Sequence, residues 1–196
     1  MKILGTLVVA SLVMTSGCAA FKANNLPPVD KASYQVANQE KVKVFSRWSF
    51  STQNSMANAQ SRAAASAVHK THFEQALRAS GCCDVVEGPE QADVVVDGVA
   101  IDEFNSAATV PAMITGFTFG VIPSWAKATV HIKATATMDG DQHKYDLSDS
   151  ATMVMWLPMV LAMPFTDNVM TVEKDMADNA YKTLIARMKN DGLLTN

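Results

Sequence analysis

KATVHIKATATM, residues 127–138, is the stretch that decides the fold. Apolar side chains at its even-numbered positions alternate with Lys, Thr and His at the odd-numbered ones. This period of two is typical of a strand with one buried face and one face in water. Asp139-Gly140 then favours a tight turn, and residues 143–155 predict a partner strand, with Tyr145, Leu147, Ala151 and Met153 on one face. The stretch therefore predicts an antiparallel hairpin with an open face.

Two helices and three more strands are predicted around this hairpin. Residues 55–80 are rich in alanine and stop at Gly81, and residues 169–190 carry apolar side chains spaced by four before Gly192. Strands are predicted at 41–50, 84–87 and 92–104, the last with a bulge or a close approach at Gly98. This order indicates one α+β domain over residues 41–196. We expect a mostly antiparallel sheet with both helices packed on one face.

The predicted order resembles the small α/β domains of bacterial envelope lipoproteins, such as the curli-secretion lipoprotein and the amino-terminal domain of the periplasmic Tol protein. The long helix, the turn at Gly81 and the strand ADVVVDG at residues 92–98 carry this resemblance. The resemblance implies a fold of that type. It transfers no functional residues to this chain.

The amino terminus has the organisation of a secretory signal. Lys2 is followed by an apolar run, Ile3 to Met14, and then by Thr15-Ser16-Gly17-Cys18. These four residues resemble the bacterial lipobox, with Thr15 where that motif prefers Leu. The resemblance implies that residues 1–17 are a cleaved signal peptide and that the sulfur of Cys18 accepts diacylglycerol, with further acyl chains such as palmitate. The apolar run is too short for a transmembrane helix, which needs about 20 residues.

The lipid on Cys18 would fix the chain to a membrane, because two or three acyl chains anchor durably. Lipoproteins kept at the inner membrane usually carry Asp after the cysteine, whereas this chain has Ala19. We therefore expect the periplasmic face of the bacterial outer membrane. Residues 18–40, rich in Ala, Asn and Pro, predict a flexible tether, with packing as an edge segment as the alternative.

The net charge excludes one class of function, and the cysteine content leaves one question open. The formal net charge is −3 without a basic cluster, so we exclude a nucleic-acid-binding protein. Beyond Cys18 the chain has only Cys82 and Cys83. Three interpretations are open for this pair: a vicinal disulfide, an intermolecular link, or two small buried apolar residues.

Two uncharged apolar segments flank the hairpin, at residues 107–125 and 153–165. Because the ends of an antiparallel hairpin lie side by side, these segments should form one continuous surface away from the Asp139-Gly140 turn. Three interpretations are open: ordinary core, a surface for self-association or an envelope protein partner, or shallow insertion into the membrane. The surface residues that we predict are Phe117, Phe119, Ile122, Trp125, Trp156, Leu157, Met159 and Phe165.

The sequence shows no phosphate-binding loop, nucleophile elbow or metalloprotease motif. His69 and His72 share a helical stripe, but two ligands make a weak metal site. Asp102 and Glu103 fall on opposite faces of their strand. We therefore predict no catalytic residue, no metal and no cofactor. The expected function is that of a membrane-anchored interaction or assembly module, and the alternative is a periplasmic carrier of lipid or another apolar ligand.

Overall fold

The fold is built around the predicted hairpin. A computed structural model describes residues 18–36, 40–52, 57–103, 109–159 and 169–195. Strands β5 (Ser124–Met138) and β6 (Asp141–Met155) have 15 residues each and are joined by the two-residue turn. Asp139 and Gly140 both have positive φ, 52° and 93°, as the tight turns that suit twisted hairpins require. Ile132, Ala134 and Ala136 are buried, whereas Lys133 is exposed, so the predicted faces of β5 are confirmed.

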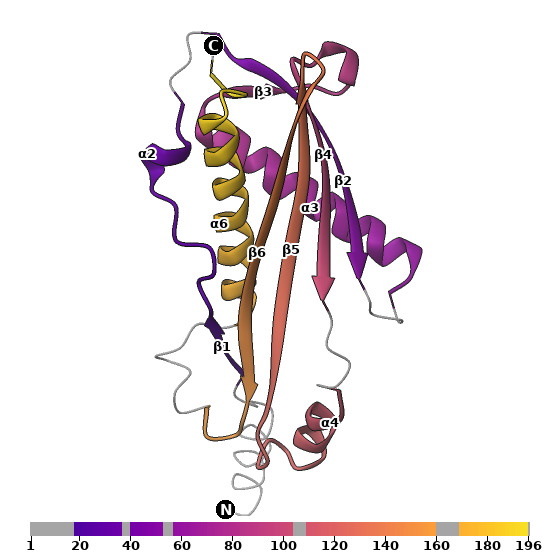
Figure 1. The fold of residues 1–196 in the computed structure, drawn as a ribbon. Helices are drawn as coiled ribbons and strands as arrows, with labels where there is room; N and C mark the ends of the chain where they lie inside the picture. Colours follow the sequence, from indigo (N-terminus) through magenta and orange to yellow (C-terminus); the bar gives the residue numbers. More distant parts are fainter. Residues whose placement is uncertain (1–17, 37–39, 53–56, 104–108, 160–168, 196) are drawn as a thin grey trace, which may run out of the picture. The chain divides into compact units, whose positions relative to one another are not determined.

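The sheet contains six strands among the described residues, in the order β1-β6-β5-β4-β2-β3 (Figure 1). Strands β1 (Cys18–Lys22), β2 (Val42–Thr52), β3 (Cys83–Val85) and β4 (Val94–Glu103) join the hairpin. β1 pairs with β6 and β4 pairs with β5 in antiparallel fashion, but β2 pairs with both β3 and β4 in parallel. The α+β class is thus confirmed, whereas the prediction of a mostly antiparallel sheet is wrong because the sheet is mixed.

The parallel pairs arise from helix α3 (Ala59–Ser80), which follows β2. A helix of this length carries the chain back along the sheet, so the next strand runs in the same direction as the one before it. Asn58 caps the helix start by accepting a hydrogen bond from the Ser61 N–H at 2.8 Å. Gly81 ends it with φ 75°, as predicted. The 3-10 turn η1 (Pro89–Gln91) then leads from β3 into β4.

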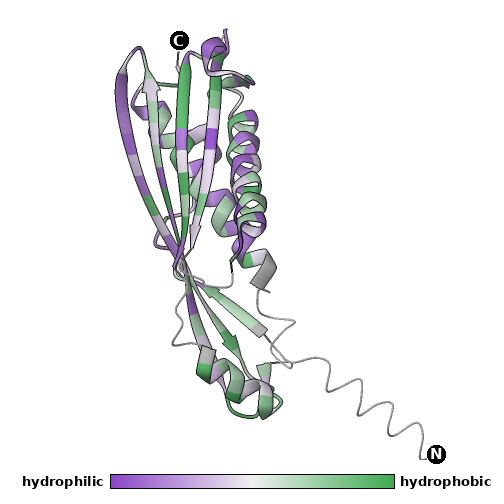
Figure 2. Cartoon of the chain, turned by 90° about the vertical axis from the view of Figure 1, so that its right-hand side faces the viewer, coloured by the Kyte–Doolittle hydropathy of each residue, from purple (hydrophilic) through white to green (hydrophobic). Residues whose placement is uncertain are grey.

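Helices α3 and α6 (Val169–Asn190) cover the same face of the sheet (Figure 2). Trp48 on β2 shows this directly, because its ring centroid lies 5.2 Å from those of both Phe73 on α3 and Tyr181 on α6. The predicted close approach at Gly98 is also present. A Cβ atom added there would lie 2.5 Å from the Trp48 ring. The backbone of β4 is therefore bare where the Trp48 ring lies over it.

The segment after Cys18 packs on the protein over residues 18–36. β1 pairs with β6 from Cys18 opposite Met155 to Lys22 opposite Ala151. Leu26 and Tyr34, the latter on the short helix α2 (Lys31–Tyr34), are buried in the core. The Asn179 side chain on α6 accepts the Val29 N–H at 3.0 Å and donates to the Leu26 carbonyl at 3.2 Å. This differs from the flexible tether predicted for residues 18–40 and matches the alternative of an edge segment, while residues 37–39 and the signal peptide lie outside the described parts.

The contacts divide the chain into two compact units. Unit 1 contains β1, helix α4 (Thr109–Phe117), the first part of β5, the last part of β6 and the start of α6. Unit 2 contains β2, α3, β3, η1, β4 and the remaining parts of β5, β6 and α6. Its core is one cluster of buried apolar side chains from all of these strands and both long helices. The two units differ sharply in what they expose.

Candidate interaction surface

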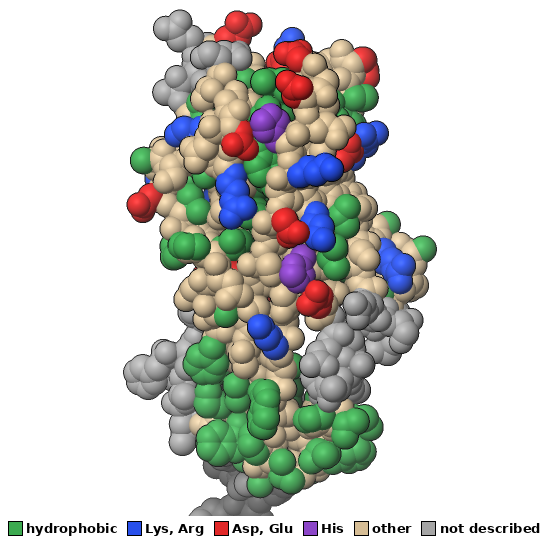
Figure 3. All heavy atoms as spheres, in the orientation of Figure 1, with side chains coloured by type: hydrophobic (Ala, Val, Ile, Leu, Met, Phe, Trp, Pro, Cys, Tyr) green, Lys and Arg blue, Asp and Glu red, His purple; other side chains and the backbone are tan. Residues whose placement is uncertain are grey.

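Exposed large apolar side chains are concentrated in unit 1. Of the twelve such side chains in the described parts of the chain, only Val68 on α3 belongs to unit 2. Figure 3 shows hydrophobic side chains gathered over α4 and the nearby strand ends. We call this set the apolar surface; its residues are Phe21, Val110, Met113, Ile114, Phe117, Phe119, Val121, Ile122, Trp125, Trp156 and Leu157.

Helix α4 presents its apolar stripe to solvent. Val110, Met113, Ile114 and Phe117 follow the spacing i, i+3, i+4, i+7 and are all exposed, Phe117 by 80%. The buried side chain on this helix is a threonine, Thr115. A surface helix of a globular protein normally places such an apolar stripe against the core. α4 does the reverse, so its stripe is available for a contact.

The helix forms despite Pro111 because this proline lies in the first turn, where a backbone N–H has no partner within the helix. The two polar side chains at the other end bond internally. Thr115 Oγ1 donates to the Pro111 carbonyl at 3.0 Å, and Thr118 Oγ1 donates to the Ile114 carbonyl at 2.9 Å. The hydroxyl groups of Thr115 and Thr118 are therefore satisfied without water.

A tight turn after α4 joins the two apolar segments. Phe119 and Gly120 have positive φ, 51° and 81°, and the Gly120 N–H donates to the Thr115 carbonyl at 2.7 Å. The Gly120 carbonyl then accepts the Leu157 N–H at 2.7 Å. A Cβ atom at Gly120 would lie 3.1 Å from the Leu157 nitrogen, so glycine suits both the φ and the space. This hydrogen bond brings residues 118–120 and 156–157 together, as the hairpin argument predicts.

Six of the eight predicted surface residues are exposed: Phe117, Phe119, Ile122, Trp125, Trp156 and Leu157. Met159 is half-buried, with its N–H donated to the Trp156 carbonyl at 3.0 Å, and Phe165 lies outside the described residues. The interpretation of these segments as ordinary core therefore does not fit these six exposed residues. Sequence reasoning missed Phe21, because residues 18–40 were predicted as a tether. The apolar triplet Ala19-Ala20-Phe21 beside Cys18 is the signal that could have indicated a strand.

Unit 2 exposes polar side chains on the sheet face opposite the helices. Arg47 on β2 makes a bidentate pair with Asp97 on β4, at 2.6 and 2.8 Å. His131 Nε2 on β5 lies 3.1 Å from Glu103 Oε1, so His131 is paired across the strands rather than simply solvated. Burial raises the pKa of the neighbouring Asp102, and a hydrogen bond from Thr52 partly opposes this. These pairs link adjacent strands and do not converge on one point.

The two predicted helix histidines lie against Tyr181. His69 Nδ1 is 2.8 Å from the Tyr181 hydroxyl, and the ring of His69 also stacks on Phe50. His72 Nδ1 lies 3.4 Å from Asp178 Oδ1. Burial, assisted by the charge of His72, lowers the pKa of His69 to about 4. Within the described residues, no group of three or more His, Cys, Asp or Glu side chains could hold a metal ion.

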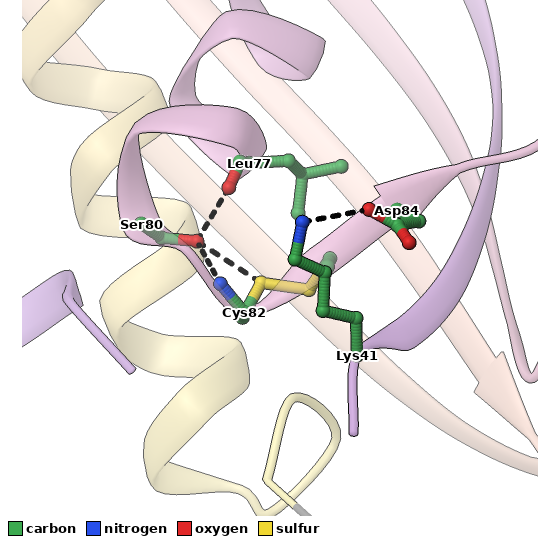
Figure 4. A network of polar contacts seen from close by, with 6 residues as sticks. Lys41, Leu77, Ser80, Cys82 and Asp84 are labelled. Carbon is green, nitrogen blue, oxygen red and sulfur yellow. Dashed lines mark hydrogen bonds and ion pairs between the residues drawn. A yellow bond between two sulfur atoms is a disulfide. The ribbon is translucent and has the colours of Figure 1, made fainter. Parts of the chain in front are cut away.

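Cys82 and Cys83 form a vicinal disulfide, one of the three open interpretations. Both cysteines are buried, directly after the Gly81 cap. Ser80 Oγ accepts the Cys82 N–H at 3.2 Å and donates to the Leu77 carbonyl at 2.6 Å (Figure 4). Beside them Lys41 and Asp84 form an exposed pair at 3.0 Å. The disulfide thus belongs to unit 2, at the corner that connects α3 to β3, and is not part of the apolar surface.

Comparisons with known proteins leave the family of this chain open. No family model and no curated protein matches it. Similar solved structures include a dodecamer of a PelC variant from Paraburkholderia phytofirmans, with a TM-score of 0.37, 15% identity, 91% of this chain covered and 99% of that chain. A protein described only as uncharacterized has a TM-score of 0.33, 8% identity, and coverage of 82% and 94%. Likenesses this weak carry no argument about function.

The helices in the described part of the chain include two of 22 residues, α3 and α6. None of them is both long enough and apolar enough to cross a bilayer. The apolar surface is built from a short helix, turns and strand ends.

Proposed function

We propose that this chain is a non-catalytic envelope lipoprotein, anchored to the outer membrane through lipid on Cys18, and that it works as an interaction or assembly module. The observation that carries the proposal is the concentration of exposed apolar side chains in unit 1. Contiguous apolar patches beyond a few hundred Å² usually mark sites that bind a protein or a membrane. This concentration of exposed apolar side chains supports a contact role for unit 1.

The apolar side chains of this surface lack the stabilisation that burial would give them, and this supports a contact role. Full burial of one Val, Leu, Ile, Phe or Met side chain is worth about 1.5–3 kcal/mol. Eleven large apolar side chains stay exposed in unit 1, whereas the rest of the described chain leaves only Val68 exposed. A fold that buries apolar residues efficiently in unit 2 but exposes them in unit 1 is suited to a partner that covers them.

A carrier of lipid or another apolar ligand is the weaker proposal. In a carrier, the two apolar segments would line a pocket for the ligand, and a large cavity beneath the hairpin would be needed. Ile132, Tyr145 and Leu147 from the hairpin are instead buried in one cluster with Leu184 and Ile185 of α6. Side chains therefore fill the interior of unit 2 at that place.

Lipidation tests the anchor. The full-length protein would be expressed in a Gram-negative bacterium, and its amino-terminal peptide analysed by mass spectrometry. We expect a peptide that begins at Cys18 and carries diacylglycerol, with the protein resistant to alkaline carbonate extraction. The Cys18→Ser variant should lose the acyl mass and become extractable by carbonate. An unmodified amino terminus in the wild-type protein would overturn the proposal.

Contact through the apolar surface needs a second test, on the protein with Cys18→Ser, because acyl chains would hold the lipidated protein on the membrane whatever its surface does. Trp156→Asp should weaken retention on membranes or crosslinking to neighbours while preserving the far-ultraviolet circular dichroism of the wild type. Val68→Asp on α3 is the matched control, because it adds the same charge at an exposed apolar position of unit 2. Equal behaviour of Trp156→Asp, the control and the wild type would count against the surface as a contact site.

A further inference from the structure

We infer that the apolar surface of unit 1 inserts shallowly into the lipid bilayer that carries Cys18. The inference rests on the proposed lipid anchor and names the partner of the surface. Three observations favour a bilayer over a protein: the position of β1, the internal bonding of α4, and the distribution of charge.

β1 places the anchor point beside the surface. It begins at Cys18, which is paired with Met155, the last residue of β6, and Trp156 follows directly. β5 lies next to β6 and begins at Ser124, followed by the exposed Trp125. Neighbouring strands are about 4.8 Å apart, so these strand ends lie within about 10 Å of one another. With β1 formed, no spacer separates an acylated Cys18 from the fold, and the membrane must lie close to this end of unit 1.

The backbone and hydroxyl groups of the surface suit a medium without water. The hydroxyls of Thr115 and Thr118 donate to carbonyls within α4, and the Thr118 oxygen also accepts the Ile122 N–H at 3.3 Å. The N–H groups of Phe119 and Gly120 bond to carbonyls of the same helix. In lipid, polar groups must be satisfied within the protein. A protein partner with its own donors and acceptors would set no such requirement.

Charge is absent from the surface and begins at its margin. Residues 104–126 and 150–166 contain no Asp, Glu, Lys or Arg. Interfaces with proteins usually include arginine and a polar rim. The first charged residue along β5 is the exposed Lys127, and the first along β6 is the buried Asp149. Lys127 suits a bilayer surface that contains anionic lipid. Tryptophan is enriched at the level of the lipid headgroups, and the surface contains Trp125 and Trp156.

Flotation with lipid vesicles tests the inference without the acyl anchor. The protein would be residues 18–196 with Cys18→Ser, which keeps every other residue that the structure describes. Vesicles of phosphatidylethanolamine with a minor share of phosphatidylglycerol serve as the probe. We expect the protein to float with the vesicles. The change Phe117→Asp/Phe119→Asp should weaken partitioning by about tenfold or more, because two inserted aromatic side chains are lost. Val68→Asp should float like the parent.

The alternatives give different results. If the parent protein remains soluble with vesicles, or if Phe117→Asp/Phe119→Asp floats as well as Val68→Asp, the inference is overturned. Sedimentation of the same samples without lipid identifies a second copy as the occupant: an oligomer that Phe117→Asp/Phe119→Asp dissociates, with no vesicle binding by the parent, also overturns it. Circular dichroism confirms that each variant is folded. Because Cys18 is not acylated in these samples, their failure leaves the lipidation result standing, and an unmodified Cys18 in cells leaves the vesicle result standing.

Discussion

At the scale of single residues, Gly98 and Trp48 show how the sheet and helices fit together. They are register partners on the parallel strands β4 and β2, and the indole covers the bare backbone of Gly98. The same indole contacts Phe73 and Tyr181. One glycine therefore permits the contact through which β2 meets both long helices.

We expect Gly98→Ala to lower the free energy of unfolding by about 1–3 kcal/mol, because the added methyl group overpacks the Trp48 ring. Urea denaturation followed by circular dichroism measures this change. Gly116→Ala is the matched control: a Cβ atom there has open space within 4 Å and the residue is helical. It should be neutral or raise stability by up to about 1 kcal/mol. Equal effects of the two substitutions would contradict the close approach.

His69 makes stability depend on pH. Its pKa is about 4 in the folded chain, and that of an unperturbed histidine is about 6.5. Between these values the unfolded chain binds more protons, so this contribution is fully present above about pH 6.5 and is lost as the pH falls toward 4. We expect the free energy of unfolding of the wild type to fall between about pH 7.5 and pH 4.5 by about 1–3 kcal/mol more than that of His69→Gln. Parallel profiles for the two proteins, measured by urea denaturation, would refute a neutral, half-buried His69 in the folded chain.

At the scale of elements, α4 is the feature that best separates this chain from an ordinary soluble domain. Its stripe faces solvent, so replacing stripe residues by charged ones should cost little stability. We predict that Met113→Glu/Phe117→Glu changes the free energy of unfolding by no more than about 0.5 kcal/mol. The same substitutions should reduce binding of a hydrophobic fluorescent dye to the native, acyl-free protein.

The comparison variant is Phe73→Ala on α3, where the ring is fully buried. It should cost about 3–5 kcal/mol in the same denaturation assay. A similar loss for Met113→Glu/Phe117→Glu would show that the stripe is packed as core, and would contradict the exposed orientation of α4.

The elements also show how far the sequence alone could lead. The hairpin was predicted from the alternation over residues 127–138 and from the Asp139-Gly140 turn. The ends of α3 and α6 were predicted from Gly81 and Gly192. These predictions succeeded because the signals are local in the sequence. The direction of β4 relative to β2 depends on which strands become neighbours, which local pattern does not encode. The long helix between them was nevertheless a sign of a parallel pair.

The sequence predicted most residues of the candidate surface, but it did not predict that β1 pairs with β6 beside them. Six residues could be chosen because two uncharged segments flank a hairpin, and a hairpin brings its ends together. β1 was missed because a five-residue strand beside Pro27-Pro28 has the composition of a linker. Its pairing depends on the unpaired edge of β6, a long-range contact. This missed strand changes the expected role of residues 18–22 from a spacer to part of unit 1.

At the scale of the whole molecule, the two units divide the proposed tasks. Unit 1 contains the start of β1 at Cys18 and the apolar surface, and we propose that it contacts the membrane. Unit 2 contains the filled core and a sheet face with cross-strand ion pairs such as Arg47–Asp97.

The three tryptophans allow this division to be measured directly. Trp125 and Trp156 belong to the exposed surface of unit 1, whereas Trp48 packs against the core of unit 2. The lipidated, purified protein would be reconstituted into vesicles whose acyl chains carry bromine, which quenches tryptophan fluorescence at short range. The wild type should lose most of the emission from Trp125 and Trp156. The Trp125→Phe/Trp156→Phe variant, which reports only Trp48, should be quenched little. Equal fractional quenching of the two proteins, or no quenching of either, would contradict a membrane-inserted apolar surface.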